Sequence, residues 1–303
     1  MKSYLFIFSL LLLASCGVQR QLTTAKERSE KAKRMAQEEE AQLDSVKMIL
    51  DARTEDHTVD SVLTKDVLDI LDKLNSRLNS VQQLALIIDA AAKNRSSFRK
   101  GIATNDILAK LILLDSFNNT QRRREEVYSM LNESVRLSKY KMFHLAAFFD
   151  QGVYRIPQTA MNTIAANFTP IIDSLSLVAN KYSNIDREAR IVFVGYSDNT
   201  PVAQTGPLYK ELVQILNKDI PSQSELNQLL SDLRAKEMAQ KIKIVLDANS
   251  ARFKNFNSLK IGYIAYGKGE AYPSPKIKDY KPSDERRRIV VCYWTVLPDI
   301  SAL

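Results

Sequence analysis

Apolar residues are spaced in two different ways along this 303-residue chain, and the spacing changes near residue 140. Before that point they recur every three or four positions, as expected of helices with one buried face. The stretch from Val18 to Gln151 contains one glycine, Gly101, and no proline, so few of its residues would interrupt a helix. Beyond that point, short β-branched and aromatic runs alternate with helical spacing, which predicts strands and helices in turn. The sequence therefore predicts an α+β fold, with an all-α region before a domain that contains a sheet.

The all-α region is predicted to span residues 22–140 and to form a coiled coil or a small helical bundle. Its best heptad pattern includes Val67, Leu74 and Ile88, which fall seven or fourteen positions apart. We expect this region to act as a spacer and to support self-association; the alternative is a docking surface for a protein partner. The predicted helices cover residues 22–51, 60–93 and 107–135, with breaks at 54–58, 94–104 and 117–120.

Two charged clusters in this region each allow a functional and a structural interpretation. Asp56, His57 and Asp60 are metal-ligand types, but a turn before a helix explains them equally well, and we predict no metal site. The run Arg122-Arg123-Arg124 could grip an anionic polymer, but a solvated helix face balanced by the following glutamates is the simpler interpretation.

The first residues predict export and lipid anchoring. Lys2 precedes the apolar run from Tyr4 to Leu13, which is shorter than the roughly twenty residues of a membrane-spanning helix. We therefore predict a signal peptide over residues 1–15 and a linker over residues 16–21. Leu13-Ala14-Ser15-Cys16 resembles the lipobox of bacterial lipoproteins. That resemblance implies cleavage before Cys16 and acylation of its thiol with chains such as palmitate. The alternative is an ordinary signal peptide with an incidental cysteine.

The expected compartment and the net charge limit the kinds of partner that this protein can bind. Gly17 replaces the aspartate that, by the lipoprotein resemblance, favours retention in the inner membrane, so we expect an outer-membrane protein facing the periplasm. The net charge of +8 favours anionic surfaces or polymers, whereas the expected compartment argues against nucleic acid. The other cysteine, Cys292, lies in a predicted strand and cannot pair with a lipidated Cys16, so we expect a buried, inert thiol and no disulfide.

The second region is predicted to form one domain over residues 141–298. Its elements follow the order β-α-β-α-β-β, which indicates a mixed sheet with helices on one face. Ser222 and Glu225 form a capping box that predicts the start of the longest helix. The predicted strands cover residues 142–149, 190–196, 259–266 and 287–295, and the predicted helices cover residues 157–182, 208–217 and 223–246.

Candidate chemistry gathers where the second strand ends. Asp198 follows this apolar strand directly, so a carboxylate lies where the strand becomes a loop. On the long helix, Asn227, Ser231 and Arg234 are spaced i, i+4 and i+7, so they share one face. An acid facing an amide, a hydroxyl and a guanidinium predicts a pocket for a ligand that carries both an amine and a carboxylate.

Four motifs in this region, taken in order, resemble the outer-membrane protein A C-terminal (OmpA-like) domain, a family that includes the peptidoglycan-associated lipoprotein. The resemblance spans residues 141–298, and its most specific element is the helical motif. The chain departs from the family pattern in three places: Tyr196-Ser197 before the aspartate, Arg286 before the paired arginines, and a long segment around residues 208–217. The motifs are Gly195-Tyr196-Ser197-Asp198, Asn227-x-x-Leu230-Ser231-x-x-Arg234-Ala235, Gly267-x-Gly269, and Arg287-Arg288-Ile289.

The resemblance implies non-covalent binding of peptidoglycan through the diaminopimelate side chain of its stem peptide. By this resemblance, Asp198 pairs with the ligand ammonium and Arg234 clamps the carboxylate. Asn227 would support the site or face the ligand. Of Arg287 and Arg288, one would line the pocket and the other would hold the domain together.

These features give one main hypothesis and two alternatives. The main hypothesis is a lipid-anchored protein that tethers the outer membrane to peptidoglycan. The first alternative is a scaffold subunit of an envelope machine for secretion, motility or division, with the helices recruiting partners. The second is a wall hydrolase, which we disfavour because His57 and His144 lie near no acid–nucleophile arrangement in the motifs. We expect no enzymatic activity and no cofactor.

Overall fold

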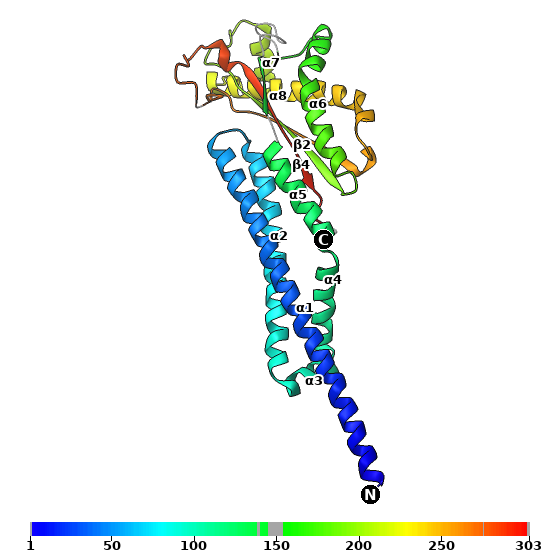
Figure 1. The fold of residues 1–303 in the computed structure, drawn as a ribbon. Coiled ribbons are helices and arrows are strands. Elements are labelled where there is room, and N and C mark those ends of the chain that lie inside the picture. Colours follow the sequence, from blue (N-terminus) through cyan, green and yellow to red (C-terminus); the bar gives the residue numbers. More distant parts are fainter. Residues whose placement is uncertain (1, 138–139, 145–153, 275, 302–303) are drawn as a thin grey trace. The chain divides into compact units, whose positions relative to one another are not determined.

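The chain forms two compact units with an α+β fold (Figure 1). The computed structural model describes residues 2–137, 140–144, 154–274 and 276–301. The first unit combines residues 1–47 with residues 68–129, and the second combines residues 48–67 with residues 130–302. The predicted spacer over residues 22–140 is therefore divided between the two units. Within the part of the chain that is described, no helix is both long enough and apolar enough to cross a bilayer.

The first unit is a bundle in which α1 (Lys2–Glu55) lies beside α2 (Ser61–Lys93). Ala25, Ala32 and Ala85 are buried between the helices with Ile88 and Phe98, so small side chains allow the helices to approach closely. The heptad prediction for α2 is confirmed. The remaining helices are α3 (Arg95–Ala103), α4 (Asp106–Asn119) and α5 (Gln121–Leu137).

Two predictions for this unit are wrong. Residues 94–104 are not a break, because α3 forms there and the Asn94 side chain caps it by accepting the N–H groups of Ser96 and Ser97. Arg124 is not on a solvated face, since it is only 5% exposed and its guanidinium donates to the Glu39 carboxylate at 2.8–3.1 Å. Long-range pairing, which the local sequence does not encode, buried this member of the arginine run.

The second unit is built on a four-stranded mixed sheet with the order β1-β4-β2-β3. β2 pairs with β3 in parallel, and β4 runs antiparallel to both β1 and β2. Parallel pairing places the ends of β2 and β3 at one edge, where Gly195 is opposite Gly267, and β4 begins at the same edge. The strands are β1 (Tyr140–His144), β2 (Arg187–Gly195), β3 (Leu259–Gly267) and β4 (Ile289–Pro298).

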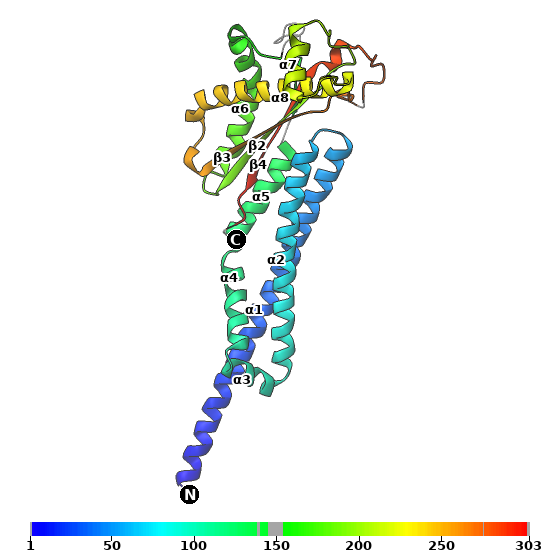
Figure 2. The same ribbon diagram turned by 180° about the vertical axis from the view of Figure 1, so that it is seen from behind.

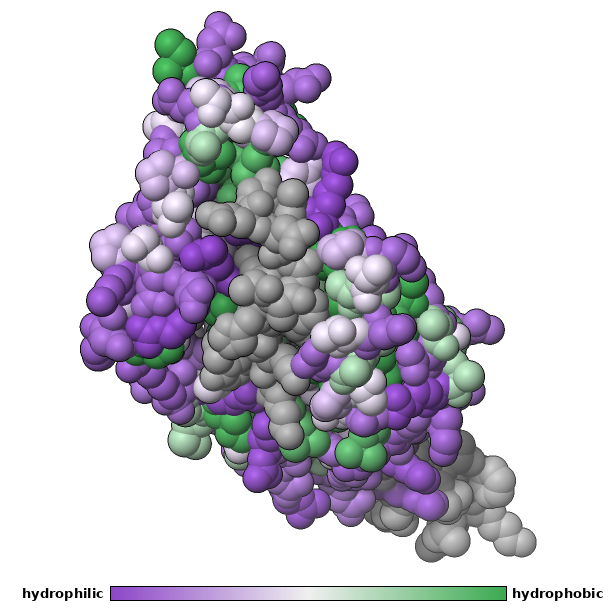
Figure 3. Space-filling view, turned by 90° about the horizontal axis from the view of Figure 1, so that it is seen from above, coloured by the Kyte–Doolittle hydropathy of each residue, from purple (hydrophilic) through white to green (hydrophobic). Residues whose placement is uncertain are grey.

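Helices cover one face of this sheet (Figures 1 and 2). α6 (Met161–Lys181) and α8 (Gln223–Ala248) pack on the strands, while α7 (Pro207–Leu216) packs on α8. The predicted capping box at the start of α8 is confirmed, and Pro170 lies within α6 without dividing it. The first predicted strand extends into residues 145–149, which lie outside the described residues. Seen from above, the surface is largely hydrophilic (Figure 3).

The opposite face of the sheet is also covered, which the sequence did not predict. Val192 and Val194 of β2 and Ile289 of β4 pack there against Leu63 of α2, with Val59 beside them. Side chains alternate between the faces of a strand, so these residues cannot reach α6 or α8. The connection between α1 and α2 is therefore part of the core of the second unit.

A polar contact fixes this connection. The Asp60 carboxylate accepts the N–H of Val62 at 2.9 Å and the hydroxyl of Tyr266 at 2.6 Å. One oxygen thus caps α2 while the other holds β3. His57 adopts a left-handed backbone conformation, with φ of 54°, in the turn before α2.

Replacing Leu63 by alanine is expected to lower the free energy of unfolding of the second unit by about 2–5 kcal/mol, because a buried side chain is lost from the sheet interface. Leu177→Ala provides the control, since Leu177 is in the same unit but 69% exposed on α6, and should change stability by less than about 0.5 kcal/mol. Urea unfolding can be followed through Trp294 of β4, the single tryptophan. Equal effects of the two variants would contradict the packing of Leu63 on the sheet.

Candidate functional site

Three loops meet at the edge of the sheet where β2 and β3 end, and backbone hydrogen bonds join them. The N–H of Ser197 donates to the Gly269 carbonyl at 2.8 Å, and the N–H of Lys268 donates to the Gly195 carbonyl at 2.8 Å. The N–H of Tyr196 donates to the Ile289 carbonyl at 2.9 Å. The residues after β2, after β3 and before β4 therefore form one fixed platform.

α8 approaches this platform very closely at Ser231. A Cβ atom at Gly195 would lie 2.1 Å from the Ser231 carbonyl oxygen, and one at Gly267 would lie 2.2 Å from its Oγ. Both positions therefore require glycine. Ser231 is fully buried; its hydroxyl donates to the Gln228 carbonyl at 2.8 Å and accepts the N–H of Gly269 at 2.9 Å. The hydroxyl that the sequence suggested as a ligand contact thus joins α8 to the loop after β3.

Asp198 provides the carboxylate of the site. It is 4% exposed, and its Oδ2 accepts the Thr200 hydroxyl at 2.7 Å. The same oxygen lies 3.2 Å from Nε of Arg288, which forms an ion pair with it. The side chain of Arg288 remains about one-third exposed, at 34%, so this pair borders the solvent.

Arg234 brings a second guanidinium to the same place, as its spacing on α8 predicted. It is 6% exposed. The pKa of Arg234 is lowered to about 10, mainly by burial and then by the positive charge of Arg288, while the negative charge of Asp198 acts in the opposite direction. These three side chains are therefore close enough to influence one another, and together they carry one more positive than negative charge.

Asn227 and Arg287 do not belong to this group of charges, and they stabilise the loops of the platform by hydrogen bonds. Asn227 is 1% exposed, and its amide donates to Glu270 Oε1 at 2.8 Å. Arg287 is also 1% exposed; it donates to Asn199 Oδ1 at 2.8 Å and to the backbone carbonyls of Pro282, at 2.6 Å, and Glu270. Its guanidinium lies 4.5 Å from the centre of the Tyr272 ring. Of the paired arginines, Arg287 thus holds the loops and Arg288 joins Asp198.

The sequence motifs did not identify the residues that hydrogen-bond to Asp198, Asn227 and Arg287. Thr200 and Asn199 follow Asp198 directly, and Glu270 follows Gly269, so proximity to the motifs was the available signal. The segment around residues 208–217 forms α7, whose Leu212 packs with Leu226 and Leu230 of α8. This packing holds α7 beside α8, the helix that carries Asn227, Ser231 and Arg234.

The arrangement suits a zwitterionic ligand. A carboxylate at Asp198 can accept an ammonium, while the guanidiniums of Arg234 and Arg288 can donate to a carboxylate. An anion near Arg234 would also offset the burial of its charge. Among the residues that the structure describes, no three His, Cys, Asp or Glu side chains gather in a way that could hold a metal ion.

Comparison with known proteins adds little to this geometry. No family model matches the chain, and no curated protein matches it. A solved structure of a MotB-like protein from Desulfovibrio vulgaris is similar to 58% of this chain and 94% of its own, with 13% sequence identity and a TM-score of 0.28. A likeness this weak supports no conclusion about function.

Ser231→Ala is expected to lower the free energy of unfolding by about 1–3 kcal/mol, because the buried N–H of Gly269 would lose its acceptor. Ser224→Ala is the matched control, since Ser224 is exposed on the same helix and should be nearly neutral. Chemical denaturation of both variants measures the difference. A stable Ser231→Ala variant would show that the hydroxyl does not join helix and loop.

Proposed function

We propose that this chain binds peptidoglycan non-covalently through the diaminopimelate side chain of the stem peptide. The observation that carries the proposal is the group formed by the buried Asp198 and Arg234 with the partly exposed Arg288. Diaminopimelate ends in an ammonium and a carboxylate on the same carbon. The ammonium would take the place of Arg288 beside Asp198, and the carboxylate would lie between the two guanidiniums. The OmpA-like motifs at these positions support the same ligand.

The electrostatics of the site favour such a ligand over a simple cation or anion. A lone cation would add to a group that already carries an excess positive charge, and a lone anion would leave Asp198 paired only within the chain. A zwitterion offers each charge an opposite partner at a site where Asp198 and Arg234 are buried. Because the platform is held by backbone bonds and by Arg287, little conformational entropy is lost on binding.

We further propose that the chain is an outer-membrane lipoprotein that faces the periplasm and tethers its membrane to the wall. The lipobox around Cys16 supports acylation, and several acyl chains would make the anchoring durable. On this proposal the chain performs no catalysis and needs no cofactor.

A second candidate function is a scaffold subunit of an envelope machine. The observation that favours it is a group of exposed apolar side chains on α4: Leu108 is 42% exposed, Ile112 59% and Leu113 55%. Glutamine at these three positions would then abolish crosslinks to envelope proteins while leaving peptidoglycan binding unchanged. Unaltered crosslinks would argue against this role.

The variants Asp198→Asn and Arg234→Lys test the proposed ligand. Each removes one charge-assisted contact or one bidentate geometry, which contributes about 1.5–3 kcal/mol, so affinity for a diaminopimelate muropeptide should fall by about 10- to 150-fold. Titration calorimetry with the full-length protein in detergent measures this loss. A muropeptide with lysine in place of diaminopimelate lacks the second carboxylate and should bind the unaltered protein as weakly.

Two exposed residues provide matched controls. Asp247→Asn and Arg123→Lys make the same chemical changes away from the site and should retain full affinity. Undiminished binding by Asp198→Asn and Arg234→Lys, or equal binding of the lysine muropeptide, would overturn the assignment of the site.

A further inference from the structure

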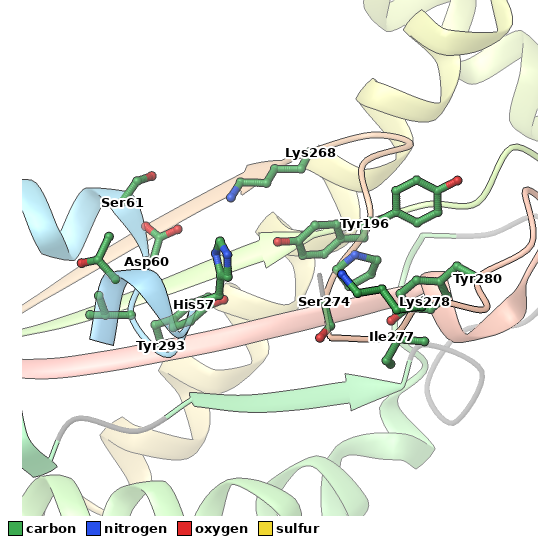
Figure 4. Close-up of a pocket in the computed structure, with 14 residues that line it drawn as sticks. His57, Asp60, Ser61, Tyr196, Lys268, Ser274, Ile277, Lys278, Tyr280 and Tyr293 are labelled. Atoms are coloured by element: carbon green, nitrogen blue, oxygen red, sulfur yellow. The ribbon is translucent and has the colours of Figure 1, made fainter. Parts of the chain in front are cut away.

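The second unit contains a cavity that the proposed diaminopimelate site does not use. It has a volume of about 690 Å³, which lies within the usual range for small-molecule sites. It is on the face of the sheet opposite α8, because Tyr196 and Tyr293 belong to the apolar cluster with Leu63 and both line it. The connection between α1 and α2 forms one wall, and the loop after β3 forms another (Figure 4).

Tyrosine rings dominate the lining. Tyr196 and Tyr293 are buried at the sheet, whereas Tyr272 and Tyr280 stack on each other in the loop, with ring centres 5.6 Å apart. Tyr272 stays 56% exposed although Arg287 lies against its ring. The exposed Tyr272 and the half-buried Tyr280 offer apolar ring surface with hydroxyl groups at the edge, and Arg286 lies 5.4 Å from the centre of the Tyr280 ring. Such surfaces suit a ligand ring that is apolar on its faces and polar around its rim, as a sugar is.

The charged groups of the cavity are mainly cationic. Lys268 and Lys278 are exposed, and neither forms an ion pair with a residue that the structure describes. Asp60 is the carboxylate in the lining, and Val62 and Tyr266 already occupy it. Figure 4 shows Lys268 extending over the side of the cavity where Asp60 and His57 lie. The cavity therefore favours a ligand that carries a negative charge.

The cavity and the diaminopimelate site share their supports. Tyr196 precedes Asp198 by two residues at the end of β2, and Arg287, which lies against Tyr272, is followed by Arg288 of the Asp198 ion pair. The residues that hold one site in position therefore also hold the other. A polymer that contains both kinds of group could occupy both sites at once and gain avidity.

We propose that this cavity binds an N-acetylated sugar ring that carries a carboxylate, the chemistry of a muramic acid residue without its stem peptide. The ring packs against Tyr272 and Tyr280, the hydroxyls of Thr54, Ser61 and Ser274 meet its polar rim, and Lys268 and Lys278 pair with the carboxylate. This inference rests on the proposed function, because it assigns a second part of the same wall polymer to the chain.

Three small probes separate the parts of this chemistry. N-acetylmuramic acid has both ring and carboxylate, N-acetylglucosamine has the ring alone, and D-lactate has the carboxylate alone. Calorimetric titration of the full-length protein in detergent should show N-acetylmuramic acid binding at least tenfold more tightly than either fragment. The double variant Lys268→Gln/Lys278→Gln should lose at least tenfold for N-acetylmuramic acid and leave N-acetylglucosamine unchanged. Lys243→Gln, an exposed lysine of α8, is the control and should bind as the unaltered protein does.

The tyrosines are tested by Tyr280→Leu, which should weaken both sugars, with circular dichroism and Trp294 fluorescence checking the fold. Equal binding of the two sugars, binding of D-lactate as tight as that of N-acetylmuramic acid, or no effect of the lysine double variant would overturn the inference.

The two proposals can fail separately. Muramic acid binding should persist in Asp198→Asn and Arg234→Lys, and diaminopimelate muropeptide binding should persist in the lysine double variant. If the unaltered protein binds the diaminopimelate muropeptide but not N-acetylmuramic acid, only the assignment of the cavity is overturned. Absence of muropeptide binding, with N-acetylmuramic acid still bound, would instead overturn the diaminopimelate site.

Discussion

The approach of α8 to the ends of β2 and β3 is the constraint on which the rest of the second unit depends. Ser231 fits between two glycines that leave no room for a side chain, and its hydroxyl replaces a missing backbone partner for Gly269. Once that contact is made, the helical spacing brings Asn227 to Glu270 and Arg234 to the neighbourhood of Asp198. The arrangement of the candidate site is thus a consequence of how closely α8 packs on the ends of β2 and β3.

Burying the charged side chains of Arg287 and Arg234 at this end of the sheet costs free energy, and the structure offsets that cost differently at the two positions. Arg287 is surrounded by carbonyl and amide oxygens, so its burial is compensated within the chain. Arg234 is buried near a like charge, so burial and the positive charge of Arg288 lower its pKa, while the negative charge of Asp198 acts in the opposite direction. On the proposed function, a ligand carboxylate beside Arg234 would lower the cost of burying its charge.

The helical region is not an independent spacer joined to a finished domain. Val59 and Leu63 complete the core on the second face of the sheet, and Asp60 ties the start of α2 to β3. A fragment beginning at the first strand would expose that apolar face to water. The same packing creates the tyrosine-lined cavity, so the ends of the first two helices help to build a second candidate site.

Local patterns in the sequence determined much of this protein. Heptad spacing identified α2, the capping box identified the start of α8, and β-branched runs identified the strands, because each depends on residues within a few positions of one another. The i, i+4, i+7 spacing likewise brought Arg234 toward the end of β2. Tertiary structure alone decided that Arg124 is buried against Glu39, that Leu63 covers the sheet, and which of Arg287 and Arg288 meets Asp198. Those outcomes depend on partners tens or hundreds of residues away, and adjacent side chains such as Arg287 and Arg288 point in different directions only once the backbone around them is fixed.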